Sequence, residues 1–134
     1  MKIFLDTNVF FDLLFNRTGN DQAQKIIQLI QSQIYAGFVA DVSLLNIDYV
    51  ANKQSQDVSP FLYFIEQNFV ILGADNRDIL SALNLDNKDL EVNVQYILAK
   101  KSICSLIVSN DKSFPQLDIP VLDSNTFLDK YGMD

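Results

Sequence analysis

Residues 3–8 read Ile-Phe-Leu-Asp-Thr-Asn, an apolar run followed at once by three hydrogen-bonding side chains. The apolar part predicts a short buried strand, and Asp6 and Thr7 then lie where that strand ends. In open α/β sheets, ligands and catalytic groups collect beyond the carboxyl ends of the strands. Asp6 is therefore a candidate metal ligand. The alternative is that Asp6 or Thr7 only caps the helix that follows.

The bulk composition predicts one soluble globular domain over residues 1–134. No stretch reaches the roughly 18 consecutive apolar residues of a membrane span, and the first residues do not resemble a signal peptide. We therefore expect no membrane association. The single cysteine, Cys104, allows no internal disulfide and fits a reducing cytoplasm. Because it lies in an apolar run, we interpret it as a buried structural thiol.

The absence of histidine excludes Ser-His-Asp and Cys-His catalysis and histidine-bound zinc. Carboxylates are then the candidate catalytic groups, and such hard oxygen ligands suit Mg²⁺ or Mn²⁺. The net charge of −7 argues against a general nucleic-acid-binding surface. It does not exclude a nuclease, because a nuclease of this kind needs acids around a divalent metal.

Strand and helix patterns alternate along the whole chain, which predicts a three-layer α/β/α domain with a mostly parallel central sheet. We expect Gly37 to end the second helix and Ser124 to cap the last one. The expected strands are 2–5, 38–42, 69–72, 106–108 and 119–122, and the expected helices are 9–15, 21–33, 43–53, 61–67, 75–83, 90–101 and 125–131.

Asp6 and Asp111 each follow an apolar strand-like run, so a parallel sheet brings them to the same edge. Asp89 and Glu91, at the start of helix 90–101, are further candidates, although either suits a capping role there. Three converging carboxylates repel one another unless a cation lies between them. A divalent cation resolves that conflict and activates water, which favours metal-dependent phosphodiester hydrolysis.

The motifs resemble those of the PIN-domain family. The opening Phe-Leu-Asp-Thr-Asn-Val-Phe-Phe-Asp-Leu-Leu (4–14) is similar to the family's first motif, and Val-Ser-Asn-Asp-Lys-Ser-Phe (108–114) is similar to its last. Asp-Leu-Glu-Val (89–92) resembles the central acidic motif in spacing. The resemblance implies a Mg²⁺- or Mn²⁺-dependent ribonuclease fold, often the toxin of a VapBC-type toxin–antitoxin pair and often a homodimer.

Carried over from the family, the site has a metal-binding and a supporting part. The resemblance implies that Asp6, Glu91 and Asp111 hold the metal. It implies that the supporting residues are Thr7, Asn8, Ser43, Asp89 and Ser109.

Two positions depart from the family pattern. Asn46 stands where the family usually has a glutamate, and Val92 where a second central acid often follows Glu91. Asn46 is still able to coordinate weakly or to bind a metal-held water, so we keep it among the catalytic residues. Because affinity for hard cations rises with ligand charge, we expect weaker metal binding.

Two basic residues are candidates for binding substrate phosphate, Arg17 after the first helix and Lys112 beside Asp111. A solvated loop position is the alternative for Arg17. The aromatic run around Phe61 and Tyr63 fits the core or a subunit contact better than base stacking. The apolar surface around helix 9–15 suits a dimer interface or a groove for an antitoxin helix.

Three function classes follow from these observations. The first is a PIN-type endoribonuclease that acts on RNA. The second is the same fold with a degraded site, acting through protein or RNA binding, and it is motivated by Asn46 and Val92. The third, a receiver-like or flavodoxin-like domain, is disfavoured because the chain has only four glycines and no glycine-rich phosphate loop.

Overall fold

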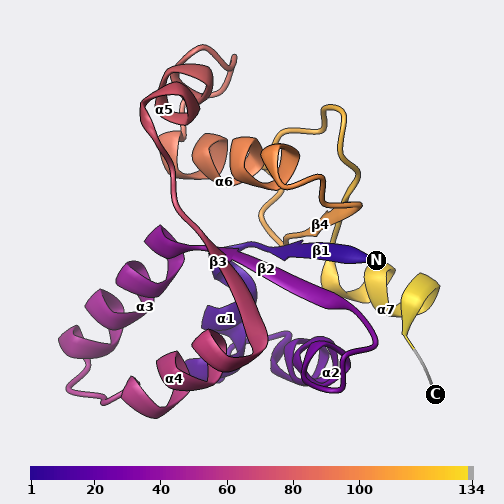
Figure 1. The fold of residues 1–134 in the computed structure, drawn as a ribbon. Coiled ribbons are helices and arrows are strands. Elements are labelled where there is room, and N and C mark those ends of the chain that lie inside the picture. Colours follow the sequence, from indigo (N-terminus) through magenta and orange to yellow (C-terminus); the bar gives the residue numbers. More distant parts are fainter. Residues whose placement is uncertain (133–134) are drawn as a thin grey trace.

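The computed structural model describes residues 1–132, in which a pair of helices follows each of the first three strands and a single helix follows the last two strands (Figure 1). The strands are β1 (Lys2–Leu5), β2 (Ala36–Ala40), β3 (Phe69–Leu72), β4 (Leu106–Val108) and β5 (Val121–Leu122). The helices are α1 (Thr7–Leu14), α2 (Asn20–Gln31), α3 (Asp41–Lys53), α4 (Ser59–Asn68), α5 (Asn76–Leu83), α6 (Leu90–Lys101) and α7 (Ser124–Tyr131).

The five strands form one sheet in the order β3-β2-β1-β4-β5, and all four pairings are parallel. The first strand in sequence is therefore the central one, flanked by β2 and by β4. Since the strands run in the same direction, their carboxyl ends share one edge. This sheet confirms the predicted α/β class, and it is parallel throughout.

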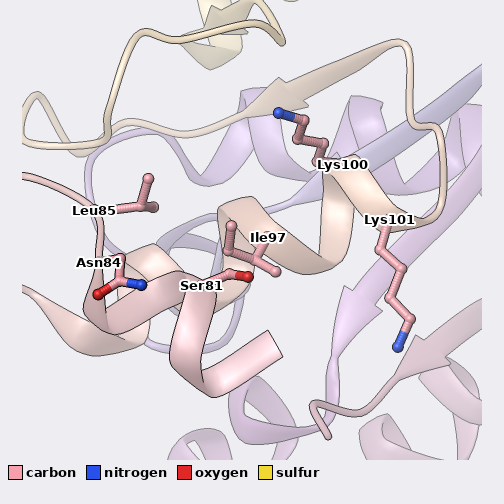
Figure 2. A pocket seen from close by; sticks show the side chains of 6 residues that line it. All are labelled: Ser81, Asn84, Leu85, Ile97, Lys100 and Lys101. Atoms are coloured by element: carbon pink, nitrogen blue, oxygen red, sulfur yellow. The ribbon is translucent and has the colours of Figure 1, made fainter. Parts of the chain in front are cut away.

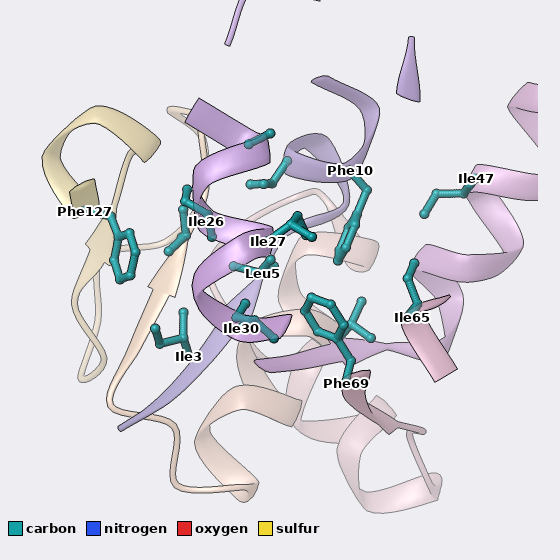
Figure 3. Packing of buried hydrophobic residues seen from close by; sticks show 14 of the residues in the cluster. Ile3, Leu5, Phe10, Ile26, Ile27, Ile30, Ile47, Ile65, Phe69 and Phe127 are labelled. Carbon is teal, nitrogen blue, oxygen red and sulfur yellow. The ribbon is translucent and has the colours of Figure 1, made fainter. Parts of the chain in front are cut away.

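Alternate residues of β1 face the two sides of the sheet, as strand geometry requires. Ile3 and Leu5 pack into a core layer with α1, α2, α3, α4 and α7, where Phe10 and Phe69 meet edge to face at 5.6 Å (Figure 3). Phe4 faces the opposite layer, which α5 and α6 cover (Figure 1). Both faces of the sheet are thus covered, and the three-layer prediction is confirmed.

The aromatic run in α4 belongs mainly to the core, as expected. Phe61 stacks on Phe64 at 6.0 Å and meets the buried Phe10 at 6.1 Å. Tyr63 is the exception and is largely exposed. The apolar residues of α1 are also mostly directed inward: Phe11, for example, is half-buried against the same core.

Two expectations about local structure are wrong. Gly37 does not end the second helix: α2 stops at Gln31 and Gly37 lies within β2. A Cβ there would lie 2.7 Å from Ile30 Cγ2 and from the Phe69 ring, so glycine permits close packing of the strand. Asp123, and not Ser124, caps α7, because its carboxylate accepts a hydrogen bond from the Thr126 backbone N–H at 2.7 Å.

Several boundaries also differ from the sequence prediction. α1 and α3 each begin two residues earlier than expected, α3 directly after β2 and α1 one residue after β1, and β2 is shifted toward the amino terminus by two residues. Short connections therefore place the start of each of these helices at the carboxyl edge of the sheet. Within residues 1–132, no helix is both long and apolar enough to cross a bilayer.

Candidate active site

Asp6 lies at the carboxyl end of the central strand and is almost completely buried, with 2% of its surface exposed. Its backbone N–H donates to Val108 O at 3.0 Å, which joins it to the end of β4. Asp6 occupies the N-cap position of α1, yet its side chain makes no capping hydrogen bond. The carboxylate instead accepts from Ser109 Oγ at 2.7 Å. The capping interpretation of Asp6 is therefore wrong.

Burial makes the charged form of Asp6 unfavourable. It raises the pKa of the carboxyl from 3.8 to about 6, the hydrogen bonds from Ser109 and Gln95 lower it in part, and the negative charge of Asp111 raises it further. A buried carboxyl with a raised pKa beside a second acid is typical of a functional site. A nearby cation would favour the charged form.

Asp111 reaches this edge through the segment that follows β4. The Asp111 backbone N–H donates to Ser109 Oγ at 3.1 Å, so one hydroxyl links both aspartates. The Asp111 carboxylate also accepts from Ser113 N and Oγ, at 2.9 and 2.7 Å. The predicted convergence of Asp6 and Asp111 is present in the structure, and the Ser109 hydroxyl lies between them.

Glu91 approaches the same edge from the first turn of α6. Its carboxylate accepts from Asn46 Nδ2 at 2.5 Å and from Thr7 Oγ1 at 3.3 Å. Thr7 in turn shares a 2.6 Å hydrogen bond with the fully buried Ser43. The structure thus joins four of the predicted site residues, from α1, α3 and α6, in one network.

The remaining residues of the central motif have structural roles. Asp89 is the N-cap of α6, where its carboxylate accepts from the Val92 backbone N–H at 3.2 Å. Val92, at the position of the missing second acid, is buried in the core beneath α6. The Val92 side chain therefore contributes to the hydrophobic core.

Gln95 is a site residue that the sequence analysis missed. It is fully buried, one turn beyond Glu91 on α6, and its Nε2 lies 3.5 Å from Glu91 Oε2. A signal for it exists in the sequence: a residue four positions after Glu91 shares its helix face, and an amide there stands out among apolar neighbours.

The predicted phosphate-binding residues lie at the surface. Lys112 is exposed and, with Ser109 and Asp111, lines a hollow of about 340 Å³. Arg17 is exposed in the turn after α1 and lies over the Phe11 ring at 5.3 Å. Asn8 is half-buried in the first turn of α1. Lys112 is thus next to the acids, whereas Arg17 makes its contact with an aromatic ring.

A separate hollow of about 480 Å³ lies between α5 and α6 (Figure 2). Its lining includes Lys100 and Lys101 and none of the site carboxylates. Both lysines are already paired, Lys100 with Asp118 at 2.7 Å and Lys101 with Asp78 at 2.9 Å. The acids at the sheet edge are therefore the better candidate for catalysis.

The carboxylates are not gathered into a ready-made metal cage. In the part of the chain that the structure describes, no three histidine, cysteine, aspartate or glutamate side chains are grouped closely enough to hold a metal ion. Asp6 and Asp111 form one part of the site, and Glu91 is held beside it by Asn46 and Thr7.

The fold and the site define a parallel α/β protein with acidic side chains at the carboxyl edge of its sheet. Comparison with known families makes this specific: the PIN domain model matches residues 2–113, and the chain belongs to that family.

Three known proteins are similar to this chain over most of its length. It is 29% identical over 142 residues to Ribonuclease VapC1 of Aquifex aeolicus (strain VF5), covering 98% of this chain and 96% of that protein. A chain of a toxin–antitoxin complex from Klebsiella pneumoniae has a TM-score of 0.69 at 15% identity, covering 91% of this chain and 97% of that one. A chain of VapBC2 from Rickettsia felis, bound to a promoter DNA fragment, has a TM-score of 0.63 at 15% identity, covering 92% and 100%. These two structures show the shared fold.

Proposed function

We propose that the protein is a Mg²⁺- or Mn²⁺-dependent endoribonuclease of the PIN type and the toxin of a toxin–antitoxin pair. The observation that carries this proposal is the buried Asp6 carboxyl at the end of the central strand, hydrogen-bonded to Ser109 and influenced by the charge of Asp111. The similarity to a protein named Ribonuclease VapC1 supports the activity and the substrate class.

The chemistry of the donor set fits a hard divalent cation. All the side chains that meet at this edge offer oxygen or amide groups, and histidine is absent from the sequence. Burial raises the pKa of Asp6 to about 6, and a bound cation would offset that effect. Because no three acids are grouped among the described residues, we infer weak affinity, with water completing the coordination.

In this proposal each site residue has a defined task. Asp6, Glu91 and Asp111 would hold the cation, and a bound cation would supply charge stabilisation for the phosphodiester and a more acidic water. Ser109 fixes the Asp6 carboxylate, and Asn46 fixes Glu91 through its amide.

The other side chains shape and flank the site. Thr7 and Ser43 form the hydroxyl pair behind Glu91. Lys112, at the hollow beside Asp111, binds a substrate phosphate, and we assign Arg17 to a more distant phosphate.

We further propose a protein partner, an antitoxin, and a homodimer. The structure supports protein contacts through large apolar side chains left exposed on α3 and α4: Leu45, Tyr49 and Tyr63 are 69%, 59% and 70% exposed. Exposed apolar side chains of this size mark interaction surfaces when they gather in a patch. A cytoplasmic location fits the single, buried Cys104 thiol.

The test is a calorimetric titration of Mn²⁺ into the wild type and into the Asp6→Asn, Asp111→Asn double variant, followed by RNA cleavage assays. We expect saturable binding and cleavage in the wild type and loss of both in the double variant. Cleavage by Asp6→Asn at the wild-type rate would refute the mechanism.

The alternative function is a PIN-fold module that binds RNA or protein without cleaving RNA. It is favoured by Val92, which is buried in the core where an acid would stand, and by Asn46, whose amide occupies one Glu91 oxygen. This alternative predicts no Mn²⁺ binding by the wild type up to several millimolar.

A further inference from the structure

Gln95 occupies its position at a cost in stability. The side chain is fully buried, and its Oε1 atom has no hydrogen-bond partner. An unsatisfied buried polar atom lowers the stability of the folded state, so it calls for an explanation. Asn93, the other buried amide on α6, donates to Ala82 O at 3.1 Å and to Asn87 O at 2.8 Å. Local hydrogen bonds therefore account for the buried amide of Asn93, whereas they do not account for that of Gln95.

The nitrogen end of the Gln95 amide faces the site acids. Its Nε2 lies 3.5 Å from Glu91 Oε2, on the same face of α6. The Gln95 side chain is also a hydrogen-bond partner of the Asp6 carboxyl, after Ser109. One NH₂ group thus lies between the carboxylate of Asp6, which follows β1, and the carboxylate of Glu91 on α6.

We propose that Gln95 is a positioning residue whose amide nitrogen bridges Asp6 and Glu91 and holds the two carboxylates at the spacing that a divalent cation requires. A neutral donor offsets the repulsion between two anions without occupying a ligand position. The site has lost charge at Asn46 and Val92, so its remaining carboxylates depend more strongly on being held in place. Residues that orient metal ligands typically change metal affinity by about 10- to 100-fold when replaced.

The first test compares Gln95→Met with Asn93→Met in metal-free protein titrated with Mn²⁺. Methionine keeps most of the volume of both side chains and removes the amide. We expect Gln95→Met to bind Mn²⁺ about tenfold more weakly than the wild type. Asn93→Met should lower the Tm, because it breaks the bonds to Ala82 and Asn87, and leave the Mn²⁺ affinity unchanged.

The second test needs no metal. A double-mutant cycle of Gln95→Met with Glu91→Gln, measured by urea unfolding in EDTA, isolates the coupling between the two side chains. We expect the unfolding equilibrium constant of the double variant to depart at least about threefold from the value that additivity gives. If Gln95→Met does not fold, Gln95→Glu takes its place in the cycle, where its repulsion with Glu91 should be relieved by Glu91→Gln.

The effect on metal affinity rests on the proposed function, whereas the bridge does not. If the wild type and Gln95→Met bind Mn²⁺ equally well, the inference is overturned and the proposed function stays intact. A wild type that binds no Mn²⁺ would refute the proposed function, and the metal-free cycle then decides the bridge alone. An additive cycle overturns the inference in either case.

Discussion

Replacing Asp6 with asparagine should make the metal-free protein more stable than the wild type above pH 6. Burial raises the pKa of Asp6 in the folded protein from 3.8 to about 6. Between these values the folded carboxyl keeps a proton that the unfolded chain has released, so stability falls as pH rises. At 1.36 kcal/mol per pH unit, the destabilisation is about 3 kcal/mol once the pH exceeds the folded pKa.

Asparagine avoids this loss because it carries no charge at any pH and still accepts from Ser109 Oγ. The bond to a neutral acceptor is weaker, so the net gain at pH 8 should be about 1–2 kcal/mol. The assay is urea unfolding in EDTA at pH 4 and pH 8. Between pH 4 and pH 8 the free energy of unfolding should fall by about 2 kcal/mol more in the wild type than in Asp6→Asn.

The matched control is Asp48→Asn, which removes an exposed carboxylate from α3 and should preserve the wild-type pH dependence. If Asp6→Asn loses the same stability as the wild type between pH 4 and pH 8, the buried carboxyl is not responsible. Saturating Mn²⁺ should reverse the order at pH 8, because a ligand that binds only the folded state stabilises it by mass action.

Three further outcomes are expected. Asp89→Ala should lose about 1 kcal/mol of stability in urea unfolding, because it removes the N-cap of α6. Its Mn²⁺ affinity, measured by calorimetry, should not change, and a tenfold weaker affinity would show that Asp89 is a metal ligand. Asn46→Glu should lower the metal-free Tm by repelling Glu91 and tighten Mn²⁺ binding about tenfold, and an unchanged affinity would argue against a cation there. Gly37→Ala should cost about 1–3 kcal/mol in urea unfolding, because its Cβ meets the Phe69 ring at 2.7 Å; wild-type stability would contradict this.

The sequence predicts those site residues whose position follows from the topology of the sheet. Asp6 and Asp111 are far apart in sequence, yet each follows a strand, and a parallel sheet brings strand ends to one edge. Helix α6 was also predictable to the residue, because Asp89 caps its start and two lysines, Lys100 and Lys101, lie in its last turn. Strong local signals and a simple topology rule are enough for these features.

What the sequence did not reveal depends on contacts between elements. Gly37 has the local appearance of a helix end, but its neighbours Ile30 and Phe69 come from other segments. Gln95 has no motif of its own, and its significance comes from the two carboxylates that the fold places around it. Such features become visible only when tertiary neighbours are known.

The central position of β1 also has a consequence for synthesis. The hydrogen bond between Ser109 and Asp6 joins residues 103 positions apart. A chain emerging from the ribosome presents Asp6 first and completes its surroundings last, after β4 has inserted beside β1. A nascent chain therefore carries only part of the acidic cluster, and a cell making the protein meets that cluster complete only after translation has passed residue 111.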